Sequence, residues 1–356
     1  MKIKSNAASV AFDHVSKVYG GSVRAVDDIS LKVEPGTLVT LLGPSGCGKT
    51  TMLRMIAGLE MATSGRILIG DRDVTKLPAT DRDVSMVFQS YALFPHMTVQ
   101  ENVAYGLKLS GHAKDEVRER TEAGLALVGL KGYGSRMPGE LSGGQQQRVA
   151  VARALVLEPQ VLLFDEPLSN LDAKLRRRVR EEIRDIQTSL GLTVVYVTHD
   201  QEEALAVSDR IIVMNNAVIA QTGTPRELYE APDTAFVADF IGEANIIPCE
   251  IADVAEGKAL VRIEKLETVL PARGLGLGSA KLAVRPNRIL LAPADAATVF
   301  AGTLRKAVYV GSHWEYGVDT AAGELFVKAL DGDPRLKVGG PVAVSFAAEG
   351  PVLLPG

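Results

Sequence analysis

Short apolar runs separated by polar, glycine-containing turns recur along the first part of the chain. Leu38–Leu42, Val161–Phe164 and Val194–Val197 are three such runs. Runs of this kind are typical of strands that are buried on both faces of a parallel sheet. Because amphipathic stretches alternate with them, including a helix expected to begin near Lys49, the pattern predicts an α/β core.

A helical segment is expected between the two halves of this core. Residues 89–155 contain few strand-like runs, and the pattern predicts helices over Asp115–Val128 and Gln145–Val156. We therefore expect a helical subdomain over about residues 89–155.

The pattern changes again near Gly242. Beyond it, Ala259–Ile263, Lys281–Val284 and Pro341–Phe346 are short strand-like runs separated by glycine and proline. Closely spaced short strands predict a small β-barrel. We therefore expect two domains, over residues 1–241 and 242–356.

The composition excludes several classes of protein. The 356 residues carry a formal net charge of −4, so the chain lacks the basic field that drives non-specific nucleic-acid binding. Cys47 and Cys249 are the only cysteines, which excludes a disulfide framework and suits the cytosol. No run approaches the roughly 18 apolar residues of a membrane-spanning helix. Met1–Asn6 leads into no signal-peptide core, so we expect a soluble protein that reaches a membrane only through a partner.

A glycine-rich segment between a predicted strand and a predicted helix carries the strongest chemical signal. It matches the phosphate-loop pattern G-x-x-x-x-G-K-[ST], whose backbone N–H groups surround phosphate oxygens. Lys49 would contact the β- and γ-phosphates, and the Thr50 hydroxyl would bind Mg²⁺. We read Cys47 as a small structural residue of the loop. The expected nucleotide-binding residues here are Gly43, Pro44, Ser45, Gly46, Cys47, Gly48, Lys49, Thr50 and Thr51.

Two acidic residues follow the strand predicted at Val161–Phe164. Asp165 would reach the metal beside the nucleotide, and Glu166 could act as the general base that polarises the attacking water. Adjacent acids after a strand also fit a solvated turn. The phosphate loop elsewhere in the chain favours the catalytic interpretation.

A second anion-binding helix start is predicted at Ser142–Gln145. Ser142 and two glycines precede a helix, which also fits an ordinary N-cap with a flexible approach. Two such helix starts in one chain leave two arrangements open. Each could serve a different nucleotide, or one nucleotide could be shared between subunits.

Together these motifs resemble the ATP-binding subunits of ABC transporters, and the resemblance covers nearly the whole chain. Ser142–Gln145 matches the signature segment of that family. Tyr19 matches the aromatic residue that stacks on adenine, and Gln89 matches the glutamine that contacts metal and water. Asp172 lies in a segment like the family's dimer-contacting loop, and His199 matches the switch histidine near the γ-phosphate.

Each of these residues also has a plainer interpretation. Tyr19 fits an ordinary strand aromatic, Gln89 fits a turn cap, and His199 fits a buried structural histidine. Asn170 stands where alanine is common in the family. The joint occurrence of the motifs in the family's order favours the functional interpretation.

The resemblance implies a P-loop NTPase core with an ABC β-subdomain and a helical subdomain, followed by a TOBE-type, OB-like β-barrel. It implies a head-to-tail homodimer that holds ATP and Mg²⁺ between the phosphate loop of one subunit and Ser142, Gly143, Gly144 and Gln145 of the other. Glu166 would be the base, His199 a γ-phosphate contact and Gln89 a sensor. Thr50, Gln89 and Asp165 would be the metal ligands.

The resemblance also implies partners and a location. Two transmembrane permease subunits would dock beside Ser90–Val99, with an extracytoplasmic substrate-binding protein as an indirect partner, and the subunit would sit on the cytoplasmic face of the bacterial inner membrane. Part of Ser90–Val99 equally fits internal packing, with Tyr91 and Phe94 shared between both roles.

Chain length and the stretch Phe236–Asn245 resemble ferric-iron, polyamine and 2-aminoethylphosphonate importers, with ferric iron preferred. A non-transport ABC ATPase is the alternative of another class, although the long coiled coils or second cassette usual there are not found. A regulatory role for the C-terminal domain would add to the importer function. Trp314, the only tryptophan, fits a barrel-core aromatic or a regulatory site.

Overall fold

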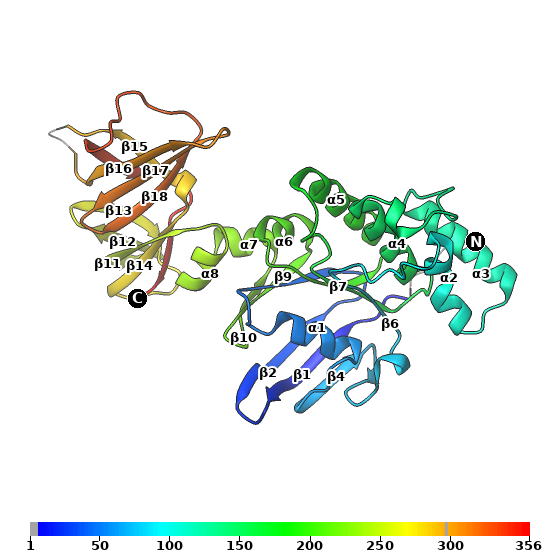
Figure 1. Ribbon diagram of the computed structural model, residues 1–356. Coiled ribbons are helices and arrows are strands. Elements are labelled where there is room, and N and C mark those ends of the chain that lie inside the picture. Colours follow the sequence, from blue (N-terminus) through cyan, green and yellow to red (C-terminus); the bar gives the residue numbers. More distant parts are fainter. Residues whose placement is uncertain (1–5, 296–297) are drawn as a thin grey trace. The chain divides into compact units, whose positions relative to one another are not determined.

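The computed structural model (Figure 1) describes residues 6–295 and 298–356. Most of the Met1–Asn6 stretch, for which the sequence predicted no signal peptide, therefore lies outside the described residues. The chain forms two compact units, residues 1–225 and 226–356.

A six-stranded sheet forms the centre of the first unit, in the order β10-β9-β3-β8-β7-β6. All its neighbouring strands are parallel except β10, which pairs with β9 in the antiparallel sense. The three apolar runs predicted as buried strands are β3, β7 and β8, so that prediction is confirmed. The bounds are β3 Leu38–Leu42, β6 Val84–Val87, β7 Val161–Asp165, β8 Thr193–Val197, β9 Arg210–Asn215 and β10 Val218–Gly223.

Alternate residues of the central strands enter two different cores. Val194 and Tyr196 of β8 pack into a core with the helices α2, α3, α4 and α5, whereas Val195 and Val197 pack into a core with α1. Successive side chains of a strand point to opposite faces, so a sheet covered on both faces needs apolar residues at every position. These helices are α1 Lys49–Ala57, α2 Val99–Leu109, α3 Lys114–Leu127, α4 Gly143–Leu155 and α5 Ala173–Leu190, and the short α6 spans Gln201–Val207.

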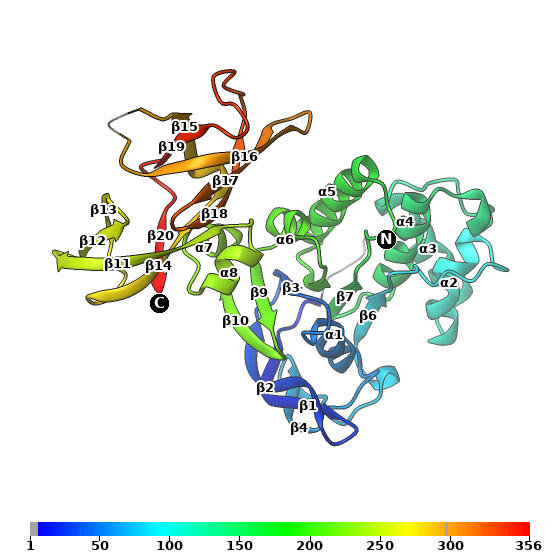
Figure 2. The same ribbon diagram turned by 60° about the vertical axis from the view of Figure 1, so that its left-hand side comes forward.

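An antiparallel sheet, in the order β2-β1-β4-β5, lies on the α1 side of the central sheet (Figure 2). Its strands are β1 Val10–Tyr19, β2 Val23–Val33, β4 Ser64–Ile69 and β5 Arg72–Asp73. The expected β-subdomain and helical subdomain are therefore both present. The helices α3 and α4 begin one and two residues before the positions that the sequence predicted, because an apolar pattern does not mark the polar residues at the start of a helix.

The second unit is built from two five-stranded antiparallel sheets that share one apolar core. The sequence predicted a small β-barrel here; the domain is built from strands as expected, and these strands form two separate sheets. One sheet contains β11 Asn245–Ala255, β12 Lys258–Ile263, β13 Leu266–Pro271, β14 Gly278–Val284 and β20 Val352–Pro355. The other contains β15 Ile289–Pro293, β16 Ala301–Tyr309, β17 Trp314–Thr320, β18 Gly323–Ala329 and β19 Pro341–Phe346. Half-buried Trp314 packs against the shared core.

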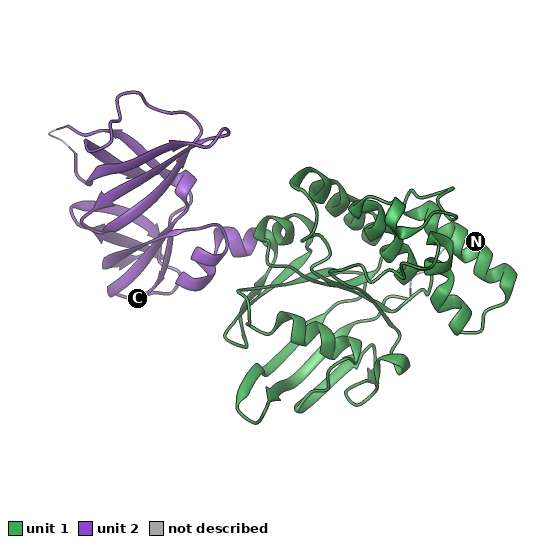
Figure 3. Cartoon of the chain, viewed as in Figure 1, with its two compact units in different colours: residues 1–225 green, residues 226–356 purple. Residues whose placement is uncertain are grey.

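The compact units meet at residue 225, earlier than the boundary after residue 241 that the sequence suggested (Figure 3). A buried arginine of the second unit accounts for the difference. Arg285 donates hydrogen bonds to the carbonyl oxygens of Tyr229 (2.6 Å), Ala238 and Ile241. These bonds hold α7 (Pro225–Glu230) and α8 (Ala235–Phe240) on the β-sheet unit.

Candidate functional site

The segment between β3 and α1 curls tightly, and its glycines are required by the backbone path. A Cβ on Gly43 would lie 2.3 Å from the carbonyl oxygen of Met214, and one on Gly48 would lie 2.1 Å from that of Ala25. Gly48 also has a φ of +105°, a value that side chains rarely allow. The sequence therefore folds here into a loop whose backbone can approach a ligand closely.

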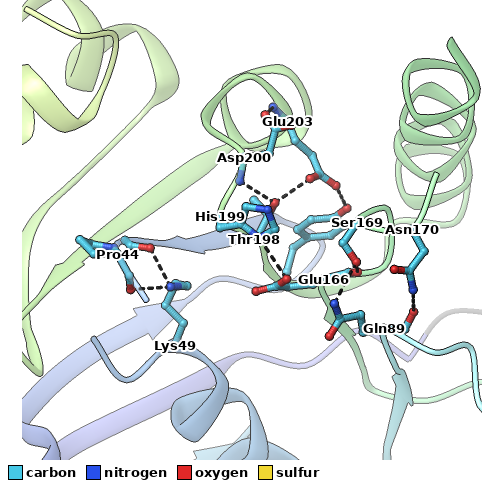
Figure 4. A network of polar contacts seen from close by, with 12 residues as sticks. Pro44, Lys49, Gln89, Glu166, Ser169, Asn170, Thr198, His199, Asp200 and Glu203 are labelled. Carbon is cyan, nitrogen blue, oxygen red and sulfur yellow. Dashed lines mark hydrogen bonds and ion pairs between the residues drawn. The ribbon is translucent and has the colours of Figure 1, made fainter. Parts of the chain in front are cut away.

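Lys49 lies inside this loop at the start of α1. Its side chain is only 6% exposed, and its ammonium donates to the carbonyl oxygens of Gly43 (2.7 Å) and Pro44 (2.9 Å), as Figure 4 shows. Thr50 and Thr51 follow in the first turn of α1, and buried Cys47 packs 3.7 Å from the Lys49 ammonium. A buried cation at a helix N-terminus makes this loop an anion site.

Asp165 and Glu166 lie at the carboxyl end of β7. Burial raises the pKa of the Asp165 carboxyl, an effect that Arg54 opposes and Glu166 reinforces. Glu166 has a φ of +46°, which is unusual for a residue with a side chain and is typical of functional sites.

The residues expected to bind Mg²⁺ offer suitable donors. Thr50, Gln89 and Asp165 supply hydroxyl, amide and carboxylate oxygens, which are hard ligands of the kind that Mg²⁺ prefers. Within residues 6–295 and 298–356, no group of three His, Cys, Asp or Glu residues could hold a metal. A Mg²⁺ ion bound with a nucleotide needs only one or two protein ligands besides phosphate and water, so this donor set fits it.

His199 follows β8, the strand next to β7. Its Nδ1 atom lies 3.0 Å from Oε2 of Glu166, and its side chain is 61% exposed (Figure 4). This exposure excludes the alternative of a buried structural histidine. An acid and an imidazole are therefore held together at the edge of the sheet where the phosphate loop also begins.

Gln89 contacts the segment that precedes α5. Its side-chain amide donates to the Ser169 hydroxyl (3.1 Å), and the Asn170 side chain donates back to the Gln89 carbonyl oxygen (3.1 Å). The Ser169 hydroxyl in turn donates to the carbonyl oxygen of Glu166. Sequence reasoning missed these contacts because about 80 residues separate the partners, and no local pattern marks them. Asp172, in the same segment, caps α5 by accepting the N–H of Leu175.

Ser142 and Gln145 form a reciprocal cap at the start of α4. The Ser142 hydroxyl accepts the N–H of Gln145 (3.4 Å), and the Gln145 side chain accepts the N–H of Ser142 (2.9 Å). A Cβ on Gly144 would lie 2.9 Å from the Leu175 side chain. The predicted N-cap is therefore present.

Tyr19 is the last residue of β1 and is 37% exposed. The ammonium of Lys17 lies 4.7 Å from the ring centroid and also pairs with Glu60. The ring thus remains available for stacking beside a positive charge.

A groove of about 410 Å³ is lined by residues of β6, by Phe88 next to Gln89 in the chain, and by residues of the helical subdomain. Phe88, Phe94, Tyr105 and Arg153 are among its lining residues. Tyr91 is instead 6% exposed and packs in the core. Half-buried Phe94 lines the groove and also packs against Tyr105, with ring centroids 4.7 Å apart, so the packing interpretation holds for both residues. Within the described part of the chain, no helix is long and apolar enough to cross a bilayer.

Comparison with known sequences identifies the family. An ABC transporter model matches residues 26–169, and a TOBE domain model matches residues 282–354. The Fe(3+) ions import ATP-binding protein FbpC 1 of Rhizobium meliloti (strain 1021) is 63% identical over 348 residues, 98% of each chain. The Fe(3+) ions import ATP-binding protein FbpC of Brucella abortus (strain 2308) is 61% identical over 342 residues, 96% of each chain.

Solved structures agree with this relationship. A Clostridium perfringens subunit of the ABC transporter complex cbiONQ matches with a TM-score of 0.58 and 28% identity, covering 62% of this chain and 89% of that one. A dimeric ATP-binding cassette in a post-hydrolysis state, bound to ADP and Pi, matches with a TM-score of 0.54 and 32% identity, covering 61% of this chain and 99% of that one. The chain belongs to the ABC transporter ATP-binding proteins, as an importer-type ATPase with a C-terminal TOBE domain.

Proposed function

We propose that this chain hydrolyses ATP to drive the import of ferric iron, with Glu166 as the general base. The catalytic role is supported by the 3.0 Å contact between Glu166 and His199. This contact lies at the edge of the sheet from which the phosphate loop starts. At this edge a carboxylate can accept a proton from water while the imidazole contacts the γ-phosphate.

The remaining side chains bind and orient the nucleotide. The Lys49 ammonium exchanges its carbonyl partners for phosphate oxygens, and the N–H groups at the start of α1 add donors. Tyr19 stacks on the adenine. Thr50, Asp165 and Gln89 would hold Mg²⁺, whose positive charge would stabilise the negative charge on the phosphate oxygens. Burial raises the pKa of the Asp165 carboxyl, and a cation beside it would stabilise the ionised form.

We further propose that two copies pair head to tail, so that Ser142 and Gly144 of one copy contact the ATP held by the other. The solved dimer among the similar structures supports this arrangement. Of the two arrangements left open by the sequence, a nucleotide shared between subunits is therefore preferred. Asp172 lies in the segment that would meet the second copy.

The partners follow from the groove beside Gln89. A helix of a permease subunit would contact Phe94 and its neighbours, and the Gln89 contacts with Ser169 and Asn170 would link that helix to the site. The subunit would then work on the cytoplasmic face of the bacterial inner membrane, with two permease subunits and an extracytoplasmic substrate-binding protein.

Ferric iron is preferred as cargo because relatives more than 60% identical over nearly the whole chain are named as Fe(3+) import proteins. Uptake of labelled ferric iron, spermidine and 2-aminoethylphosphonate should be compared in cells that lack this gene. We expect loss of iron uptake alone, restored by the wild type and not by Glu166→Gln. Loss of spermidine or 2-aminoethylphosphonate uptake, with iron uptake retained, would overturn the assignment of ferric iron as cargo. If uptake of all three compounds is retained, a non-transport ATPase would be favoured.

A further inference from the structure

A buried carboxylate lies directly behind the turn that carries His199. Glu203, on α6, is only 4% exposed. One of its oxygens accepts the Thr198 hydroxyl at 2.6 Å, and the other accepts the Tyr196 hydroxyl (Figure 4). Burial raises the pKa of the Glu203 carboxyl, and these two hydrogen bonds oppose that shift. A buried acceptor of this kind is costly unless it is fully satisfied.

These contacts close a ring around the backbone of His199. The Thr198 hydroxyl accepts the N–H of Asp200 at 3.0 Å, and the Asp200 carboxylate accepts the N–H of Glu203 at 3.0 Å. The residues on both sides of His199 are therefore fixed through one carboxylate. The His199 side chain is largely exposed and contacts Glu166, so its position depends on the backbone of this turn.

The ring also reaches the segment that precedes α5. The second oxygen of Asp200 accepts Arg176 at 3.1 Å, and Arg176 donates to the carbonyl oxygen of Leu171 at 3.1 Å. The turn of His199 is thus connected to the segment that contains Asp172.

We propose that Glu203 is a positioning residue for hydrolysis, which holds His199 in place through Thr198 and Asp200. The inference rests on the role proposed above for His199 at the γ-phosphate. Glu203 is buried behind the turn, so it acts through the turn. Small displacements of a group at a reacting centre can cost about a hundredfold in rate, which gives this support a measurable effect.

The first test is kinetic. Glu203→Gln keeps the side-chain shape but replaces one accepting oxygen by an NH₂ group, which cannot accept from a hydroxyl. We expect kcat to fall about tenfold to a hundredfold while KM for ATP stays at the wild-type value, because the phosphate loop is untouched. A wild-type kcat in this variant would overturn the proposal.

A matched pair separates positioning from simple loss of stability. Thr198→Val and Tyr196→Phe each remove one hydroxyl from the same buried carboxylate, so both should lower Tm. Only Thr198→Val breaks the ring around His199, and only it should lower kcat. Equal loss of kcat in the two variants would mean that Glu203 acts through general stability, and the proposal would fail.

A spectroscopic readout separates this inference from the role of His199 itself. The chain has five histidines, so the His199 imidazole signal in a histidine-labelled sample can be assigned with His199→Gln. We expect that signal to shift or broaden in Thr198→Val and Glu203→Gln but not in Tyr196→Phe. An unmoved signal in the first two variants would refute the positioning. Wild-type turnover in His199→Ala would instead refute the proposed role of His199.

Discussion

Oε2 of Glu166 lies 3.0 Å from Nδ1 of His199, although the residues are 33 positions apart in the sequence. They meet because β7 and β8 are parallel neighbours, whose carboxyl ends fall at one edge of the sheet. The phosphate loop leaves the same edge, since β3 is the other neighbour of β8. Ligands of open α/β sheets bind at this edge, and the Glu166 carboxylate, the His199 imidazole and the loop that carries Lys49 all lie there.

Replacing Lys49 by alanine tests the anion site. Hydrogen bonds to charged groups contribute about 1.5–3 kcal/mol, so the dissociation constant of ATP should rise about tenfold to a hundredfold. Titration calorimetry would measure it. Lys32→Ala is the matched control, because Lys32 is an exposed lysine of β2 that pairs with Glu34. Unchanged ATP affinity in Lys49→Ala would count against the phosphate role.

Asn170→Ala tests the link between Gln89 and the segment before α5. The change removes the hydrogen bond to the Gln89 carbonyl oxygen and leaves the phosphate loop intact. A hydrogen bond that contributes about 1 kcal/mol corresponds to a change of about fivefold in the coupling between ATP hydrolysis and transport. We expect less iron to be imported per ATP hydrolysed in proteoliposomes, with basal hydrolysis retained. Ser189→Ala, at the far end of α5, should import iron normally; equal coupling in both variants would contradict the link.

Asp165→Asn tests the buried carboxyl through its pH dependence. Because burial raises the pKa of Asp165 in the folded protein, its ionised form costs stability, and that cost grows as pH rises through the raised pKa. Below about pH 4 the carboxyl is protonated in both states and the cost vanishes. Without nucleotide, Asp165→Asn should therefore have a higher Tm than the wild type at pH 7, with a smaller difference near pH 4.

The same variant should lose stabilisation by ligand. Adding ATP and Mg²⁺ should raise its Tm less than that of the wild type, because an amide is a weaker metal ligand than a carboxylate. Removing Mg²⁺ with a chelator should erase that difference between the two proteins. A full Mg²⁺-dependent Tm shift in Asp165→Asn would exclude Asp165 as a ligand.

Arg285→Met tests how α7 and α8 are held on the second unit. Three carbonyl oxygens lose their donor, and each buried unsatisfied group costs about 1–3 kcal/mol, so we expect a loss of about 3 kcal/mol in the free energy of unfolding. Urea denaturation of the full chain would measure it. Arg335→Met, at an exposed arginine that pairs with Asp333, should unfold like the wild type.

The sequence predicts the main strands and helices of the core well. The phosphate loop is a contiguous pattern, and the apolar runs of β3, β7 and β8 are explicit because both faces of the central sheet are covered. The helix cap at Ser142 also depends only on residues close by in the sequence. Each of these features depends on neighbours in the chain, which is why a single sequence reveals them.

Contacts between distant residues are harder to predict. The contact of Gln89 with Ser169 depends on strand order, which no local pattern encodes. The domain boundary followed a change in composition near residue 242, whereas Arg285 ties the preceding helices to the second unit through backbone oxygens. Carbonyl groups are the same in every residue, so the sequence does not mark them as partners. The sequence predicts a partly exposed Tyr91, whereas the residue is buried. Burial of an aromatic residue in a loop depends on packing against distant residues, which no local pattern shows.

The most direct test of the central claim is Glu166→Gln, measured for ATP hydrolysis and ATP binding in the same preparation. The account predicts that hydrolysis falls at least about a hundredfold, while the dissociation constant of ATP stays at the wild-type value, because the change removes the base and leaves Lys49 and the loop intact. Near-normal turnover in Glu166→Gln would contradict the account.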